Sequence, residues 1–355
     1  MRPNVWFVSQ RQHFLNSRLQ GFGATIFAEM SALAERTQSV NLGQGFPDTD
    51  GPAEVAEAAI AAIRDGRGNQ YPPGLGIPEL REAIAEHQSR FYGLNFNPDT
   101  EILVTAGASE ALAASVLALC ETGDEVVTFE PWYDIYGANI AMAGAVKKVV
   151  TLRPPNYGFD EQEFLAAITP KTRMILLNTP HNPTGKVFVR EELEFIAHVA
   201  VEHDLIVVTD EVYEHLVFDG EHIAMASLPG MRERTITISS GGKTFSFTGW
   251  KIGWAVAPPE LLTAVRTAKQ FLTYVSGGPF QYAIAVGLRL CDSYFHELAN
   301  DMRKKRDFLS EGLKAAGLEV FDSQGTYFVT TDVRSVGYDD GLDFCWKLPE
   351  KVGVL

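Results

Sequence analysis

Residues 235–254 read TITISSGGKTFSFTGWKIGW, and this stretch sets the expectations for the rest of the chain. Ile236 and Ile238 alternate with Thr and Ser, which predicts a strand that is broken by the small residues 239–242. Lys243 then stands at the carboxyl end of that strand, where open α/β sheets bind ligands. Lys251 follows in the same stretch, so one amine is available as a nucleophile and one as an anchor for an anion. Taken alone, the pattern is more often a glycine-rich surface loop with two solvated lysines.

The sequence contains partial matches to two nucleotide-binding motifs, and neither match is complete. GGKT (241–244) resembles the end of the phosphate-binding loop of NTPases, but that motif requires a glycine where this chain has Thr237. GLGIPEL (74–80) lacks the third glycine of a dinucleotide fingerprint and is interrupted by Pro78. A ligand other than a nucleotide is therefore expected at Lys243.

The composition limits the class of protein. With 355 residues, 46% of them hydrophobic, the chain can bury a large core, and one large domain with a smaller one is expected. A formal net charge of −15 without a basic run disfavours nucleic acid and anionic membranes as partners. The three cysteines are far apart, which predicts reduced, mostly buried thiols and no metal site. Because the first residues contain no signal peptide core and no stretch approaches a membrane span, a cytoplasmic protein is expected.

Strands and helices alternate from residue 101 onward, which predicts a parallel sheet with crossover helices. EILVTAG (101–107) reads as a strand and ASEALAASVLALC (108–120) as a helix that begins at Ala108 and Ser109. Small residues at a helix N-terminus leave its amides open to an anion, although an ordinary tight turn is the commoner explanation. EVVTFE (125–130) is a further strand, and Tyr133 just beyond it can stack on a planar ring or simply pack in the core.

Other candidate residues lie at strand ends and in polar loops. LIVVTDEVY (205–213) places Asp210 at the end of a buried strand, where a carboxylate requires a cation, a helix cap or a structural ion pair. RMILLNTPHNPTG (173–185) is a strand followed by a turn that holds Asn182. The loops NLGQGFPD (41–48) and GNQYPPGLG (68–76) present Gly45 and Tyr71.

The C-terminal part predicts a small, unfinished α+β unit. Residues 260–275 and 280–317 read as two long helices, and EVF (319–321) and GTYFVTT (325–331) as strands. A short helix is expected near 340–348, and VGVL (352–355) begins what looks like another strand. Because the chain stops there, this unit is expected to be truncated at its C-terminal end.

The candidate residues together indicate one chemistry. Six features fall at strand ends of one predicted sheet. They are a lysine, a buried aspartate, an open helix N-terminus, an asparagine, an aromatic ring and a second cation. Pyridoxal 5′-phosphate requires such a set: an amine for a Schiff base, a carboxylate for the pyridine nitrogen and a cradle for the phosphate. A free lysine has a pKa of about 10.4, so Lys243 needs burial or a neighbouring cation such as Lys251 to act as a nucleophile.

Over residues 18–355 the sequence resembles the class I aminotransferases, which are pyridoxal phosphate enzymes of fold type I. The resemblance rests on NLGQGFPD, NQYPPG, EPWYDIY, HNPTG, TDEVYEHLVF and SSGGKTFSFTGWKIGW. Within the family it is similar to the kynurenine and methionine aminotransferases, and most to the N-succinyldiaminopimelate aminotransferases of actinobacteria. The resemblance implies a large domain (49–285) with a mostly parallel seven-stranded sheet between helices. It also implies a small α+β domain from both chain ends (18–48 and 286–355). Residues 1–17 show no clear periodicity, which predicts either a disordered arm or an extension from an upstream start codon.

The resemblance also implies roles for individual residues. Lys243 would bind the cofactor and move the proton between Cα and C4′, and Asp210 would pair with the pyridinium nitrogen. Asn182 and Tyr213 would hydrogen-bond the ring 3-oxygen, and Tyr133 would stack on the ring. The phosphate would be held by the amides of Ala108 and Ser109, by Ser240 and Lys251, and by Tyr71 of the neighbouring subunit of a homodimer. The substrate carboxylate would contact Gly45 and Asn182, and Tyr71 would also contribute to substrate binding.

The implied reaction moves an amino group from an amino-acid donor to 2-oxoglutarate, with N-succinyl-LL-diaminopimelate as the expected donor. Methionine, glutamine and kynurenine are alternative donors, and a cysteine-S-conjugate β-lyase would use the same lysine. A cofactor-binding protein without turnover is the alternative of another class. The family binds the substrate α-carboxylate with an arginine that would lie beyond Leu355, so cofactor binding with weakened transamination is expected.

Overall fold

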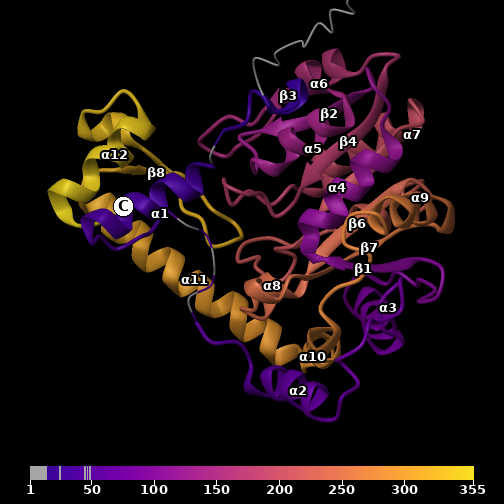
Figure 1. Ribbon diagram of the computed structural model, residues 1–355. Helices are drawn as coiled ribbons and strands as arrows, with labels where there is room; N and C mark the ends of the chain where they lie inside the picture. Colours follow the sequence, from indigo (N-terminus) through magenta and orange to yellow (C-terminus); the bar gives the residue numbers. More distant parts are fainter. Residues whose placement is uncertain (1–13, 24, 44, 46, 48) are drawn as a thin grey trace, which may run out of the picture.

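The computed structural model describes residues 14–355 apart from positions 24, 44, 46 and 48. Within these residues the centre is a seven-stranded sheet of order β1-β7-β6-β5-β4-β2-β3 (Figure 1). Its pairs are parallel except for those of β7, which runs antiparallel to β1 and β6. The strands are β1 (Ile102–Ala106), β2 (Glu125–Glu130), β3 (Val146–Thr151), β4 (Thr172–Asn178), β5 (Ile206–Asp210), β6 (Thr235–Ser240) and β7 (Ile252–Val256). The predicted fold class, α/β with a mostly parallel seven-stranded sheet, is confirmed.

Helices cover both faces of this sheet. The helices are α1 (Ile26–Thr37), α2 (Ala53–Arg64), α3 (Pro78–Tyr92), α4 (Gly107–Leu119), α5 (Ile135–Ala143), α6 (Glu161–Ala167), α7 (Arg190–Glu202), α8 (Gly241–Thr244), α9 (Pro259–Lys269), α10 (Gly278–Leu288), α11 (Asp292–Ala315) and α12 (Gly341–Val352). Helices α4, α5 and α9 pack on one face, and α2, α3 and α10 together with α6 and α7 pack on the other. None of the described helices is both long and apolar enough to cross a membrane.

The strands are apolar because both of their faces are buried. In β1, Leu103 packs among residues of α4 and α9, whereas Ile102 and Val104 pack among residues of α2, α3 and α10. Residues 206–210 of β5 are all buried, which places the carboxylate of Asp210 at the edge of the core rather than in solvent. The carboxylate of Asp210 thus lies at the carboxyl end of a buried strand.

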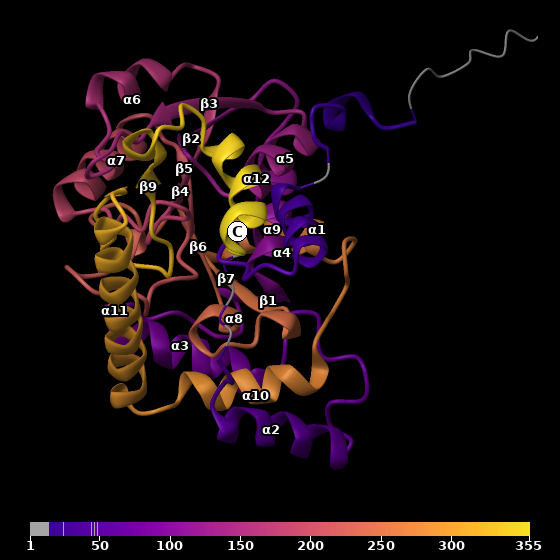
Figure 2. The same ribbon diagram turned by 90° about the vertical axis from the view of Figure 1, so that its left-hand side faces the viewer.

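Segments from the two ends of the described chain pack together beside the sheet. Helices α1 and α12 lie side by side, indigo and yellow in Figure 1. Leu355 packs with Met30, Leu33 and Ala34 of α1, and Val354 forms one parallel bridge with Val40. Helix α11 leads from α10 toward the short strands β8 (Glu319–Val320) and β9 (Thr331–Asp332), as Figure 2 shows.

Two predictions for helices were wrong. The helix expected over 280–317 is two helices, α10 and α11, because the backbone at Cys291 is extended and caps the start of the second one. The helix expected over 260–275 ends at Lys269. The predicted arm lies largely outside the described residues, since only 14–17 of it are described.

Three further predictions need correction. The strand that was expected to break at Ser239 continues through Ser240, and GGKT forms the short helix α8 instead of a loop. Of GTYFVTT only Thr331 lies in a strand, because Thr326 has a left-handed backbone with φ of +67° that ends any extended pairing. The cysteines are not mostly buried: Cys120 is buried, whereas Cys291 and Cys345 are exposed.

Candidate active site

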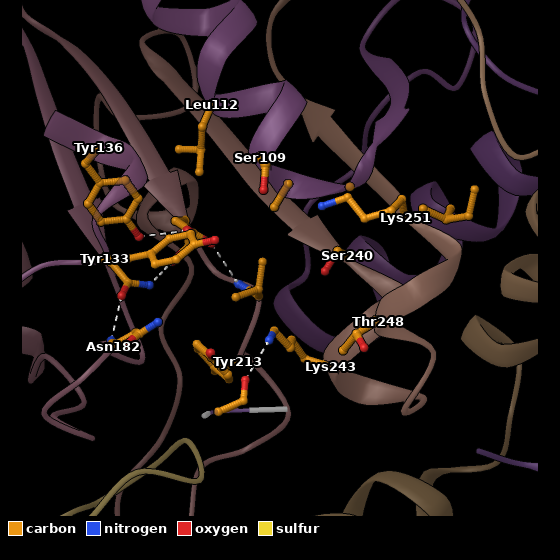
Figure 3. A pocket seen from close by; sticks show the side chains of 18 of the residues that line it. Ser109, Leu112, Tyr133, Tyr136, Asn182, Tyr213, Ser240, Lys243, Thr248 and Lys251 are labelled. Atoms are coloured by element: carbon orange, nitrogen blue, oxygen red, sulfur yellow. Dashed lines mark hydrogen bonds between the residues drawn. The ribbon is translucent and has the colours of Figure 1, made fainter. Parts of the chain in front are cut away.

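A pocket of about 340 Å³ opens at the carboxyl ends of β4, β5 and β6 and at the start of α4 (Figure 3). Every predicted site residue except Tyr71 lines it. The lining residues include Gly45, Ala108, Ser109, Tyr133, Asn182, Asp210, Tyr213, Ser240, Lys243 and Lys251. Residues that are far apart in the sequence, from Gly45 to Lys251, are thus brought to one edge of the sheet, as expected for an open α/β fold.

Lys243 lies in α8, directly after β6. Its Nζ donates a hydrogen bond to Tyr327 Oη at 2.7 Å and a longer one to Gly45 O at 3.5 Å. Burial lowers the pKa of the Lys243 amine to about 8, the charge of Lys251 acts in the same direction, and Asp210 opposes both. The direction of the Lys251 effect agrees with the prediction, and a lowered pKa makes the neutral, nucleophilic amine more abundant at neutral pH than in free lysine.

Asp210 is the last residue of β5 and is 4% exposed. Tyr136 Oη donates to its Oδ2 at 2.8 Å, and the Val212 amide donates to Oδ1 at 3.4 Å. Burial raises the pKa of Asp210 to about 6, although these two donors and the charge of Lys243 lower it. Among the described residues no cation forms an ion pair with Asp210. A buried carboxylate in a pocket is therefore open to a cationic nitrogen of a ligand.

The start of α4 and its neighbours form a cradle for an anion. The first amides of this 13-residue helix have no acceptor within it, and the helix dipole is positive there. Gly107 has φ of +72°, and a Cβ at this position would lie 3.3 Å from Lys251 Nζ, so the lysine reaches the helix terminus. A Cβ on Gly253 would lie 2.5 Å from the Gly107 carbonyl carbon, so glycine is required for this close approach. The hydroxyls of Ser240 and Thr248 complete the cradle.

Asn182 is held in place by a residue that was not predicted. The backbone N–H of Asn182 donates to Asn178 Oδ1 at 2.6 Å, and the side-chain Nδ2 of Asn178 donates to the backbone oxygen of Asp210 at 2.8 Å. Asn178 therefore ties the turn after β4 to the end of β5. The side chains of Asn182, Tyr133 and Tyr213 are directed toward the pocket between these strands in Figure 3.

A buried polar network holds the segment that follows Asp210. Ser239 and Tyr92 donate hydrogen bonds to the two carboxylate oxygens of Glu214, both at 2.5 Å. The ligand atoms of His87, Glu214 and His215 lie within 4.8 Å of one another, but the two imidazoles bond to each other through Nε2 at 2.7 Å. Because these bonds already occupy both glutamate oxygens and the facing ring nitrogens, we assign the cluster a role in fixing the backbone.

The sequence analysis also missed two residues that line the pocket, Tyr136 and Phe328, and Tyr327, which bonds Lys243. Tyr136 lies at the start of α5, three residues after Tyr133, and the two rings meet edge to face with centroids 5.8 Å apart at the pocket. This spacing could have identified Tyr136 as a partner of the same ligand. Tyr327 and Phe328 were placed in a strand, and no local signal distinguishes the turn that carries them except the Gly325 that precedes it.

Tyr71 lies outside the pocket. Its side chain is 83% exposed, and it lines a second hollow of about 290 Å³ with the segment 275–278. Its ring meets that of Tyr274 edge to face, with centroids 5.8 Å apart. The described chain therefore does not bring Tyr71 to the anion cradle of its own pocket.

The sequence matches the family profile "Aminotransferase class I and II" over residues 37–355, and the chain belongs to this family. It is 54% identical over 341 residues to a probable N-succinyldiaminopimelate aminotransferase of Mycobacterium tuberculosis, covering 95% of this chain and 86% of that protein. It is 41% identical to the methionine aminotransferase of Escherichia coli, over 95% of this chain and 88% of the relative. The solved structure of the M. tuberculosis N-succinyldiaminopimelate aminotransferase superposes with a TM-score of 0.94 at 53% identity, covering 96% of this chain and 89% of that one.

Members of this family act with pyridoxal 5′-phosphate, and the predicted family and cofactor are confirmed. The pocket fits that group on three observations. It contains an amine whose pKa is lowered, a buried carboxylate without a cationic partner among the described residues, and a glycine-lined helix terminus for a phosphate. These are the functional groups that the cofactor's aldehyde, ring nitrogen and phosphate require.

Proposed function

We propose that this aminotransferase uses N-succinyl-LL-diaminopimelate as amino donor and 2-oxoglutarate as acceptor. The proposal is supported by the identity of 54% to the probable N-succinyldiaminopimelate aminotransferase, well above the 41% to the methionine aminotransferase. The observation that carries the chemistry is the placement of Lys243 and Asp210 in one pocket with the anion cradle.

Lys243 is proposed to bind the cofactor and then to move the substrate proton. Its lowered pKa supplies a neutral amine near neutral pH, which can attack a carbonyl carbon or accept a proton from the substrate Cα. When bound, the cofactor supplies an electron sink for the negative charge that develops at that carbon. Asp210 is proposed to keep the sink effective by holding a protonated ring nitrogen with its carboxylate.

The remaining lining residues are proposed to orient the ligands. The amides of Ala108 and Ser109, the Ser240 hydroxyl and Lys251 would hold the phosphate, since they surround the start of α4. Asn182 and Tyr213 would bond the ring 3-oxygen, and Tyr133 would cover one ring face. Gly45 and Asn182 would contact the substrate carboxylate.

A donor panel tests the proposed substrate. The cofactor-loaded protein is incubated with 2-oxoglutarate and one donor at a time, and glutamate formation is measured against a Lys243→Ala control. The highest kcat/KM is expected with N-succinyl-LL-diaminopimelate, compared with methionine, glutamine and kynurenine. A higher value with one of those three would contradict the proposed donor. Release of pyruvate and ammonia from a cysteine S-conjugate without an oxo acid would indicate a β-lyase instead.

We also propose that the active form is a homodimer in which Tyr71 serves the pocket of the other subunit. Tyr71 does not line its own pocket, and its exposed ring contacts that of Tyr274, which is itself 55% exposed. If this is correct, mixing inactive Lys243→Ala with impaired Tyr71→Ala restores activity, because about a quarter of the sites then contain both residues. No recovery after mixing, with subunit exchange verified by mass, would contradict the shared site.

A cytoplasmic location is proposed for this enzyme. It is supported by the exposed thiols of Cys291 and Cys345, which remain unpaired most readily in a reducing compartment. Cell fractionation with an antibody against the protein tests this, and recovery of the enzyme outside the cytoplasm would contradict it.

A further inference from the structure

The hydroxyl of Tyr327 is the main contact of the Lys243 amine. Lys243 Nζ donates to Tyr327 Oη at 2.7 Å, and Tyr213 Oη donates to the same oxygen at 3.3 Å. Tyr327 Oη in turn donates to the carbonyl oxygen of Gly45 at 2.7 Å. A tyrosine hydroxyl offers one donor and two acceptor positions, and all three are occupied here. Burial raises the pKa of Tyr327 above its ordinary value, so the hydroxyl stays protonated and keeps its bond to Gly45.

The backbone around Tyr327 is fixed to the large sheet. The amides of Gln324 and Gly325 donate to Gly185 O at 2.9 and 2.8 Å, and the Thr326 amide donates to Leu216 O at 2.7 Å. Gly185 follows β4 and Leu216 follows β5, so the segment 323–328 is anchored to the two strand ends beside the pocket.

Local packing leaves the Tyr327 side chain little freedom. Thr326 is fully buried and has φ of +67°, a conformation that a β-branched residue adopts only where its surroundings impose it. On the other side, a Cβ at Gly45 would lie 2.3 Å from the Phe328 ring and 2.8 Å from the Tyr327 ring. The tyrosine ring is thus held between a strained turn and a glycine that has room for nothing larger than hydrogen.

We propose that Tyr327 is a positioning residue that holds the Lys243 amine, whenever it is not bonded to the cofactor, in the orientation for proton transfer at the substrate Cα. The inference rests on the proposed aminotransferase function. The Lys243 side chain has four rotatable bonds, and a fixed acceptor 2.7 Å from Nζ restricts them by binding one N–H. After the amine takes a proton from Cα, the ammonium still donates to the same oxygen.

The test compares Tyr327→Phe with Tyr157→Phe as a matched control. Tyr157 Oη bonds Thr330 Oγ1 at 2.9 Å, so the control also removes a hydroxyl that holds this C-terminal segment, but outside the pocket. The first readout uses protein without cofactor: the rate at which acetic anhydride labels Lys243 is measured against pH by peptide mass spectrometry. Because an acceptor favours the ammonium form, its loss is expected to shift the midpoint to lower pH in Tyr327→Phe and to leave it unchanged in Tyr157→Phe. An unchanged midpoint in Tyr327→Phe would overturn the proposal.

The second readout is kinetic. With a donor deuterated at Cα, Tyr327→Phe is expected to lower kcat about tenfold or more, to change KM little, and to raise the isotope effect on kcat. A change in KM alone, or a lower kcat without a larger isotope effect, would overturn the positioning role in favour of a packing role at Gly45. Absence of turnover in the unmodified enzyme with every donor would instead contradict the proposed function. The labelling profile would still show whether Tyr327 contacts the Lys243 amine.

Discussion

At the scale of single residues, the pocket shifts the pKa values of two ionisable groups in opposite directions. Burial lowers the pKa of Lys243 to about 8 and raises that of Asp210 to about 6, so each group changes charge closer to neutral pH than usual. Between these two values Asp210 is charged while part of Lys243 is neutral. These are the forms that the proposed roles require, one as partner of a cation and one as nucleophile.

Replacing Lys251 tests its influence on Lys243. Lys251→Met removes a nearby positive charge, so the pKa of Lys243 is expected to rise and its labelling midpoint in cofactor-free protein to move to higher pH. Cofactor affinity is expected to fall roughly 10- to 100-fold, because a charge-assisted bond to the phosphate contributes about 1.5–3 kcal/mol. Lys304→Met on the exposed face of α11 is the control and should change neither quantity. A midpoint that stays in place would refute the electrostatic coupling.

Replacing Tyr136 tests whether its hydroxyl lowers the pKa of Asp210. The Tyr136 hydroxyl stabilises the charged carboxylate, so Tyr136→Phe is expected to raise the pKa of Asp210 further. Since the carboxylate form is the one proposed to bind the cationic ring nitrogen, cofactor affinity is expected to be lost as pH falls through that pKa. The loss should therefore begin at higher pH in the variant, as measured by equilibrium titration of cofactor between pH 5 and 8. Identical curves for both proteins would show that Tyr136 does not set the charge of Asp210.

At the scale of elements, close backbone contacts decide the geometry of the pocket. The start of α4 reaches β7 only because Gly107 and Gly253 face each other. The alternating strands, buried runs and small-residue helix start that define these elements could be predicted from the sequence. Helix α8 and the turn at Thr326 could not be, because tertiary contacts rather than local pattern impose them.

Gly253→Ala tests the contact between β7 and α4. Its new Cβ would meet backbone atoms of Gly107 and residue 108 within 2.5 to 2.8 Å, so the helix start must move. Cofactor affinity is expected to fall at least tenfold, together with thermal stability. Gly312→Ala is the matched control, because this exposed glycine in the interior of α11 has no neighbours within 4 Å. It should stabilise the protein by about 0.5–1 kcal/mol and leave binding unchanged. Unchanged cofactor affinity in Gly253→Ala would contradict the cradle.

At the scale of the whole molecule, the pocket is shared between the sheet and segments from both ends of the described chain. Phe27 of α1, Gly45 and Phe328 line it together with the strand ends. The sequence predicted the strand-end residues because polar residues that directly follow buried strands are recognisable in it, and because its motifs resemble those of a known family. Tyr327 and Phe328 escaped prediction, since their position depends on how a distant segment docks at Gly185 and Leu216.

Leu33→Ala tests whether the segments from the two chain ends pack independently of the sheet. Leu33 is 2% exposed in the small cluster that joins α1 to Leu355, and a buried Leu→Ala change costs about 2–5 kcal/mol of stability. Hydrogen exchange is expected to accelerate in α1 and α12, and the KM for the amino donor to rise because α1 carries Phe27. Cofactor affinity should stay within about twofold, since the cores around the sheet are separate clusters. Equal acceleration across the sheet would contradict an independently packed unit.

The most direct test of the central claim is the identity of the lysine that binds the cofactor. The protein is incubated with pyridoxal 5′-phosphate, the bond to the amine is fixed with borohydride, and the modified peptide is located by mass spectrometry. The account predicts modification of Lys243, at one group per chain, and its absence in Lys243→Ala. Stoichiometric modification of Lys251 or another lysine instead, with Lys243 unmodified, would contradict it.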